Sequence, residues 1–240
     1  QILTHYPRSL EQARQITWQE AWTERETPVP MPDYFQNILE SLAFVARESE
    51  LVDKSSGVSA RLSIAFLENV ISNVERRQLR TSEAEAWPRF ADLHAALPAV
   101  TGKIELAYEG EREGLAVVAS SLLGKAILQA FRQLYPRLSK DDDKPVQDDP
   151  VYGRILGWFA KGNQLELSDD TPFDEHLAAL RAIPGLETLA KKHLKPATPG
   201  AQALAMELVL EGLHQENLLG RETLDGLLRF TDMLATMLNK

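Results

Sequence analysis

The strongest candidate for chemistry is a short stretch, residues 56–61 (Ser-Gly-Val-Ser-Ala-Arg), which precedes the longest apolar-periodic segment of the chain. A serine at position 55 or 56 can cap a helix that starts here, and Gly57 lets a ligand approach the backbone. The first amides of a helix lack intrahelical partners and attract anions, and Arg61 adds a positive charge where the helix dipole disfavours one. The pattern therefore predicts an anion site. The alternative is a surface arginine that pairs with a nearby carboxylate: Glu48, Glu50 or Asp53.

Other phosphate-binding and catalytic motifs are incomplete. Two Gly-Lys pairs, at 102–103 and 124–125, match the end of a Walker A loop, but neither has the leading glycine or the following Ser or Thr that the motif requires. The G-x-S-x-G turn of serine hydrolases is also missing. The sequence therefore predicts no ATP site and no serine hydrolase within these residues.

The sequence offers little for a metal ion, and we predict no metal site. The chain has no cysteine, which excludes thiolate zinc sites, iron–sulfur clusters and disulfides. No two histidines stand three or four residues apart, so each is expected to be a surface or capping residue: His5, His94, His176, His193 and His214. Two acidic groups lack the spacing of a calcium loop and are expected to be solvated: Asp141, Asp142 and Asp143, and Glu105, Glu109, Glu111 and Glu113.

The elements that must position these residues are expected to be helices. Apolar residues recur every three or four positions along most of the chain, which predicts an all-α, mostly helical fold. In the first part we expect helices over 33–46 with Asp33 as N-cap, 55–80, 83–97 ended by Pro98, and 115–134, with a short strand or extended loop at 104–108. In the second part we expect helices over 151–161, 172–182, 184–191, 201–215 and 221–238, and a short strand is allowed at 164–167.

An acidic segment divides the chain. Residues 139–150 hold five aspartates and, apart from two prolines, one apolar residue, which is typical of a solvated linker. We therefore predict a first region over 1–138, a linker over 139–150 and a C-terminal helical extension over 151–240 that resembles a small bundle. Apolar stripes in the extension are expected to be core: Met206, Leu208, Val209 and Leu213, and Leu227, Leu228, Met233, Leu234 and Met237.

Composition narrows the function classes. The 240 residues carry a net charge of -9, which argues against a general nucleic-acid binder because phosphate contacts need a basic face. The longest apolar stretch, 114–123, falls short of the roughly 20 residues that a membrane-spanning helix needs. The lack of cysteine fits the cytoplasm. The chain begins with Gln1 and shows no signal segment, so we expect a piece of a longer protein.

Residues 56–61 resemble the sensor-2 motif of AAA+ ATPases of the MoxR and magnesium-chelatase-subunit-I branch. That motif is commonly Gly-Ala-Ser-Pro-Arg and opens a helix of the C-terminal helical lid. Further stretches resemble bacterial proteins labelled magnesium chelatase or its ATPase-like relatives: residues 52–62 through Glu75-Arg76-Arg77, then 92–94, 98–106 and 108–111, and the entry at 5–8. The resemblance covers residues 1–138 well and the remainder loosely.

The resemblance implies a role for each matching residue. Arg61 matches the sensor-2 arginine, which reaches the γ-phosphate of ATP bound on the core and couples hydrolysis to lid movement. Gly57 and Ser59 would shape the helix start beside the nucleotide, and Ala60 replaces the usual proline. The Walker A, Walker B, sensor-1 and arginine-finger residues are expected to precede Gln1. ATP and Mg²⁺ are then cofactors of the full-length ATPase, and this fragment alone binds neither and is not catalytic.

The resemblance also implies partners. These are the chain's own AAA+ core, other copies in a homo-oligomeric ring, and a von Willebrand-type domain protein. The alternative is a non-enzymatic helical protein-interaction module, in which the arginine-rich end of the long helix and the acidic second half dock another protein. A chelating enzyme that acts directly on a tetrapyrrole is a weak third reading, because metal insertion in the chelatase family belongs to a different subunit.

Overall fold

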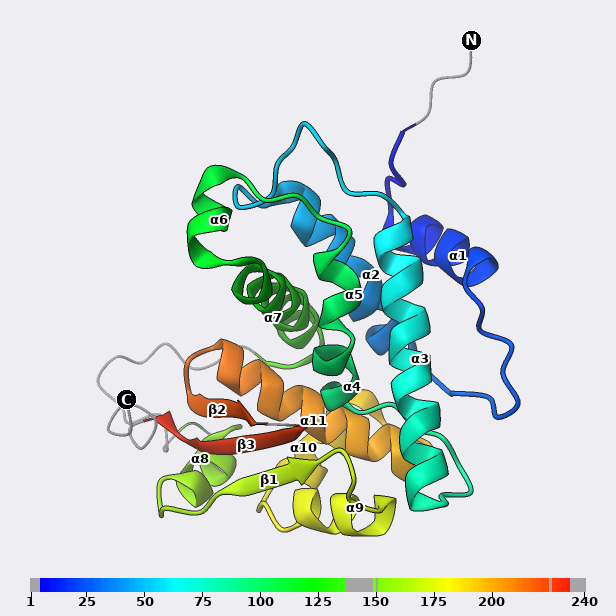
Figure 1. Ribbon diagram of the computed structural model, residues 1–240. Coiled ribbons are helices and arrows are strands. Elements are labelled where there is room, and N and C mark those ends of the chain that lie inside the picture. Colours follow the sequence, from blue (N-terminus) through cyan, green and yellow to red (C-terminus); the bar gives the residue numbers. More distant parts are fainter. Residues whose placement is uncertain (1–4, 137–148, 150, 225, 234–240) are drawn as a thin grey trace. The chain divides into compact units, whose positions relative to one another are not determined.

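The computed structural model describes residues 5–136, 149, 151–224 and 226–233. They form a mostly helical structure with a small three-stranded antiparallel sheet, so the prediction of an all-α fold is wrong in this respect (Figure 1). The acidic segment 139–150 lies outside the described residues, apart from Asp149. The chain divides into two compact units, one of residues 1–76, 85–88 and 92–126 and the other of residues 77–84, 89–91 and 127–240.

The first helix of unit 1, α1 (Leu10–Glu20), was not predicted from the sequence, and the Ser9 side chain caps it. The predicted second helix is α2 (Asp33–Glu48), where Pro32 occupies the cap position and Asp33 is the first helical residue. Ile38, Leu42 and Ala46, spaced four residues apart on this helix, are fully buried. A buried carboxylate on this helix, Glu40, accepts hydrogen bonds from Thr17 of α1 at 2.7 Å and from Ser63 at 3.0 Å.

The long helix α3 (Arg61–Thr81) starts later than the serines at 55 and 56 predicted. Its first 16 residues belong to unit 1 and the remaining five to unit 2. Leu62, Phe66 and Val70 form its fully buried face, and the neighbouring Asn69 is exposed. The face thus repeats at intervals of four residues, as a core-facing helix requires.

The predicted helix over 83–97 is wrong in both its bounds. Residues 83–89 are not helical, and two short helices follow, α4 (Phe90–Ala95) and α5 (Leu97–Thr101). Pro98 lies in the first turn of α5 and does not end a helix. Proline suits that position because the missing N–H would have no intrahelical partner there.

The extended stretch expected at 104–108 is present as a single β-bridge between Val52 and Leu106. The short helix α6 (Tyr108–Glu113) follows it, and then α7 (Leu115–Leu134), whose bounds match the prediction. Helix α7 is long and apolar enough to cross a membrane by length and composition, so the predicted shortfall in length is wrong. Buried core helices pass the same test, and Val118, Leu122 and Ala126 of α7 are fully enclosed, which favours a core helix.

Unit 2 holds the sheet, in strand order β1-β3-β2, with all pairs antiparallel. Strand β1 (Leu165–Ser168) confirms the strand allowed near 164–167. Strands β2 (Leu219–Leu224) and β3 (Leu227–Asp232) replace the helix expected from residue 221, and residues 234–238 of that helix lie outside the described part. The sequence Asp225-Gly226 is typical of a hairpin turn, and Gly226 has the positive φ of +83° that such a turn needs.

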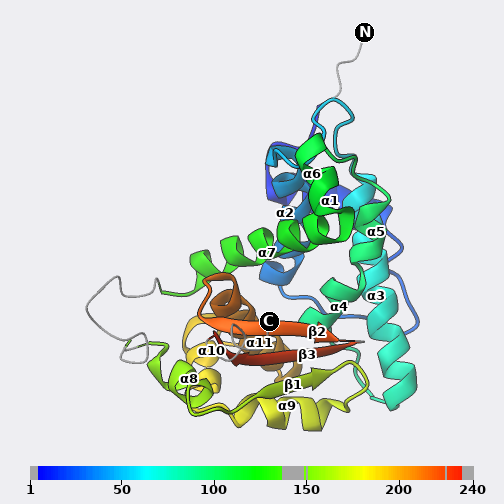
Figure 2. The same ribbon diagram turned by 60° about the vertical axis from the view of Figure 1, so that its left-hand side comes forward.

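The helices of unit 2 lie close to their predicted positions: α8 (Gly153–Phe159), α9 (Phe173–Arg181), α10 (Leu186–Leu194) and α11 (Pro199–Gln215). Helix α11 is central to the unit, since residues 202–213 are buried, and it packs against β2, α9 and α10 (Figures 1 and 2). The first predicted core stripe, from Met206 to Leu213, is therefore confirmed. Helix α11 packs against strand β2 as well as against helices, so unit 2 is not the small helical bundle that the sequence predicted.

Candidate functional site

Arg61 is the first residue of α3, and its side chain is exposed. Among the described residues its guanidinium has no hydrogen-bonding or ion-pairing partner. The carboxylate of Asp53 instead accepts two hydrogen bonds from Ser55, one from the amide and one from the hydroxyl, both at 2.8 Å. These bonds lower the pKa of Asp53, which is therefore ionised without help from the arginine. The alternative of a surface ion pair between Arg61 and a neighbouring carboxylate is thus not realised.

The start of α3 is capped by Ser59, and the predicted caps at 55 and 56 are wrong. The Ser59 hydroxyl accepts from the Arg61 amide at 3.2 Å, and its carbonyl accepts from the Leu62 amide at 3.0 Å. The Ile64 amide donates to the Ala60 carbonyl at 3.3 Å. Two of the amides expected to be unpaired, those of Arg61 and Leu62, are therefore bonded within the chain, and any attraction for an anion depends mainly on the Arg61 guanidinium.

Gly57 is required by both its backbone and its surroundings. Its φ of +69° lies in the left-handed region that side chains disfavour. A Cβ placed on it would stand 2.4 Å from the Tyr6 hydroxyl oxygen, well inside contact distance. The side chain that approaches this glycine is that of Tyr6 in the same chain, and the approach of a ligand to the Gly57 backbone stays a prediction.

The next residue, Val58, is bonded at both of its backbone groups. Its amide donates to the Tyr6 hydroxyl at 3.0 Å, and its carbonyl accepts from Nε of Arg47 at 3.2 Å. The Arg47 guanidinium also lies over the Tyr6 ring, 4.3 Å from its centre. Burial lowers the pKa of Arg47, while the charges of Glu40 and Tyr6 act in the opposite direction. Tyr6, Arg47 and Val58 form one contact group, here called the Val58 clamp.

A second set of contacts holds the residues before the clamp. The Ala107 amide donates to the Leu51 carbonyl at 3.0 Å, and the Asp53 amide donates to the Glu105 carbonyl at 2.8 Å. The Ser56 hydroxyl donates to the Glu105 carboxylate. Three stretches that are far apart in the sequence, 5–8, 51–61 and 105–110, therefore meet at the start of α3. They are stretches from which the family resemblance was drawn.

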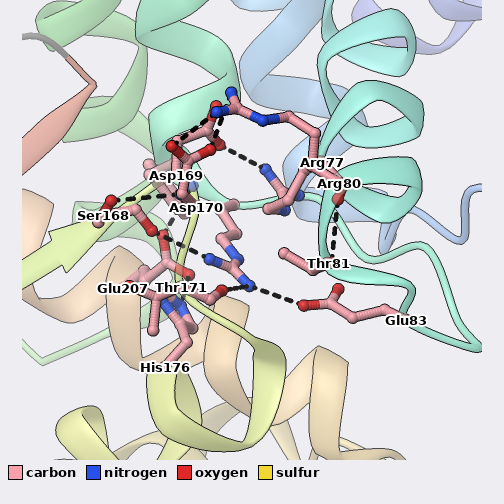
Figure 3. Close-up of polar contacts among 12 residues, drawn as sticks. Arg77, Arg80, Thr81, Glu83, Ser168, Asp169, Asp170, Thr171, His176 and Glu207 are labelled. Carbon is pink, nitrogen blue, oxygen red and sulfur yellow. Dashed lines mark hydrogen bonds and ion pairs between the residues drawn. The ribbon is translucent and has the colours of Figure 1, made fainter.

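Unit 2 contains a second polar cluster, which the sequence did not reveal (Figure 3). At the end of α3, Arg77 and Arg80 point toward Asp169 and Asp170 in the loop after β1 and pair with them at 2.9 Å each. Arg89 donates to two carbonyls of the same loop, Ser168 at 3.2 Å and Thr171 at 2.8 Å. The arginines at this end of α3 therefore stabilise the loop after β1.

His176 belongs to the same cluster and is buried, so its prediction as a surface or capping residue is wrong. Its Nε2 lies 2.9 Å from Oε1 of Glu207, whose other oxygen accepts from the Phe90 amide at 2.7 Å (Figure 3). Burial lowers the pKa of His176, Glu207 raises it, and Arg89 and Arg77 lower it further. Since His176 and Glu207 are 1% and 2% exposed, no substrate reaches them, and the pair is structural.

Metal ligands do not gather in the described part of the chain, where no group of three or more His, Asp or Glu side chains could hold an ion. The run Asp141, Asp142 and Asp143 lies outside the described residues.

The chain matches no protein-family model, no curated protein and no solved structure with which it was compared.

Proposed function

We propose that this chain is the C-terminal part of an AAA+ ATPase similar to the MoxR and magnesium-chelatase-subunit-I branch. Residues 1–138 would include its helical lid, and Arg61 would be the sensor-2 arginine that meets the γ-phosphate of ATP. The observation that carries this proposal is the exposed guanidinium of Arg61, at the first position of α3 and without a carboxylate partner among the described residues.

The charge of Arg61 supports a role toward an anion. A cation in the first turn of a helix opposes the helix dipole and costs a few tenths of a kcal/mol. No acidic residue in that turn of α3 offsets this cost. A guanidinium presents a planar fork of donors that remains charged, which suits a phosphate group better than an ammonium does. An anion supplied from another domain would therefore satisfy a group that the described chain leaves unpaired.

The proposal needs components beyond these residues. ATP and Mg²⁺ would be held by a nucleotide-binding core encoded before residue 1, and this part of the chain would bind neither alone. The full ATPase would form a homo-oligomeric ring in the cytoplasm and act on a partner, either a protein that it remodels or a metal-insertion complex. A von Willebrand-type domain protein would be one such partner.

The alternative is a non-enzymatic interaction module, and one observation favours it. Leu79, Tyr108 and Trp22 are large apolar side chains that are 83%, 70% and 65% exposed. The interaction module was also predicted from the arginine-rich end of α3, as a surface that docks another protein. Arg77 and Arg80 are already paired with Asp169 and Asp170, so they offer little to a docking protein.

The test is a nucleotide assay on the full-length protein. In the proposed role, Arg61→Ala lowers ATP turnover by roughly tenfold or more, because hydrogen bonds to charged groups are the stronger ones. It weakens binding of a non-hydrolysable ATP analogue and leaves ADP binding unchanged, since ADP lacks the γ-phosphate. Arg61→Lys is expected to recover only part of the loss, because lysine lacks the planar fork.

The matched control is Arg112→Ala, which removes another exposed arginine of unit 1. It should leave turnover and both affinities at wild-type values. Wild-type turnover in Arg61→Ala would refute the nucleotide role. So would a complete reading frame that encodes no phosphate-binding loop before residue 1, and the interaction module would then be the better reading.

A further inference from the structure

We propose that Tyr6 is a positioning residue, which holds Arg61 in place for the phosphate through the Val58 clamp. This inference rests on the proposed function, because the consequence of the clamp is measured at Arg61. It goes further by assigning a role to a residue that lies 55 positions away in the sequence and touches no phosphate itself.

The clamp fixes one residue from two sides. The Tyr6 hydroxyl accepts from the Val58 amide, and Nε of Arg47 donates to the Val58 carbonyl. The ring of Tyr6 in turn supports the Arg47 guanidinium at 4.3 Å. Such a cation–π contact adds to the attraction between the two side chains. Removing the Tyr6 hydroxyl therefore frees one side of Val58 and leaves the ring contact in place.

The neighbouring glycine makes the clamp specific to tyrosine. Gly57 has a positive φ and lacks the Cβ that would collide with the Tyr6 oxygen. The backbone therefore leaves a space of the right size for a hydroxyl beside the Val58 amide. A phenylalanine fits the same space but cannot accept the hydrogen bond, so Tyr6→Phe separates the bond from the packing.

The effect of the clamp passes to Arg61 along a short path. Ser59 follows Val58 directly, and its hydroxyl and carbonyl bond the amides of Arg61 and Leu62. Val58 is itself buried, so its backbone and side chain are both fixed, while the arginine three residues later is exposed. Movement of Val58 displaces Ser59 and with it the first turn of α3.

Tyr6 is also placed to respond to the core. In the proposed ATPase, the segment that carries Tyr6 follows the nucleotide-binding core directly. Its side chain is 48% exposed, so loss of its hydrogen bond should change local order and leave the core of unit 1 intact. In the proposed ATPase, the Val58 clamp would thus connect the segment that follows the nucleotide-binding core to Arg61, which contacts the nucleotide.

The experiment compares Tyr6→Phe with wild type in the full-length protein. Hydrogen exchange at the Val58 amide should become about fivefold faster, as expected for one lost hydrogen bond. Binding of a non-hydrolysable ATP analogue should weaken by about the same factor, with ADP binding unchanged. A merely structural role of Tyr6 would lower both nucleotide affinities together or neither. Arg47→Lys, which keeps the charge and loses Nε, should show the same pattern.

The decisive measurement is the double variant. If Tyr6 acts through Arg61, Tyr6→Phe has no further effect on ATP-analogue binding once Arg61→Ala is present. Additive effects, or an unchanged ATP affinity in Tyr6→Phe with faster exchange at Val58, would overturn the positioning role while leaving the proposed function intact. If Arg61→Ala itself leaves nucleotide binding unchanged, the proposed function and this inference both fail.

Discussion

His176 offers the sharpest prediction of stability, because its ring is buried in a charged cluster. The ring donates from Nε2 to Glu207, while Nδ1 has no hydrogen-bond partner among the described residues. Protonation would place an unsatisfied N–H at Nδ1 in a site that is 1% exposed. Arg89 and Arg77 also oppose a positive charge there, and Glu207 alone favours it. We therefore expect the ring to remain neutral in the folded protein well below pH 6.5.

The magnitude follows from the lowered pKa of His176. The unfolded chain binds the proton with a pKa of about 6.5, and the folded chain binds it only at lower pH. As the pH falls below 6.5, the unfolded state gains protons first and the free energy of unfolding decreases. Between pH 7.5 and pH 5.5 the free energy of unfolding falls by roughly 1 kcal/mol when the ring stays neutral in the folded state. This contribution is fully present above pH 7.5.

The assay is urea denaturation of wild type and His176→Gln at both pH values. Glutamine cannot take up a proton and retains an amide donor for Glu207, so the variant should lose roughly 1 kcal/mol less stability than wild type on acidification. The pKa of His193 is also lowered by burial, but this group is present in both proteins and its effect cancels. His5→Gln, which replaces an exposed histidine, is the control. Equal pH dependence in wild type and His176→Gln would refute the reasoning.

Two further predictions concern stability. Gly110→Ala places a Cβ 2.3 Å from the Leu51 carbonyl oxygen and should lower the free energy of unfolding, measured by urea titration, by about 1–3 kcal/mol. The control Gly157→Ala in α8 meets no atom within 4 Å and should leave that free energy unchanged or raise it by up to about 1 kcal/mol. Equal effects of the two substitutions would contradict the packing at Gly110. Arg77→Met removes the 1% exposed guanidinium that pairs with Asp169 at 2.9 Å and should cost about 3–5 kcal/mol. Arg80→Met removes one side of a pair that is 56% exposed on both sides and should cost about 0–1 kcal/mol. Similar losses in the two variants would show that burial does not set the strength of these pairs.

The bounds of helices were predicted best where apolar residues recur every three or four positions without interruption. Helix α7 has the predicted bounds, and α9 and α11 lie within two residues of theirs. The failure at β2 and β3 has a different cause. Leu228 and Phe230 are buried and Arg229 between them is less so, which is a period of two that a search for helical spacing passes over. The dipeptide Asp225-Gly226 in the sequence is typical of a hairpin turn and favours two strands over one helix here.

The candidate site was only partly predictable. Arg61 and Gly57 were identified from residue type and position alone, and both stand where a helix starts. Tyr6 and Arg47 were not, because the bonds that join them to Val58 connect residues 52 and 11 positions apart and follow no local pattern. The burial of His176 was missed for a similar reason. Its partner Glu207 lies on another helix, and a lone histidine gives no sign of which face it occupies.

Arg61 differs from the other arginines in its surroundings, and this difference supports its proposed role toward a phosphate. Arg77, Arg25 and Arg132 each pair with a carboxylate within 3.0 Å, which explains their positions without any ligand. An unpaired arginine on a surface is ordinary, and Arg112 is one example on an exposed short helix. Arg61 differs because it stands in an unfavourable first turn and because the backbone before it is bonded to two distant segments. A freely moving surface charge needs no such support, whereas a charge that must meet a ligand in one geometry does.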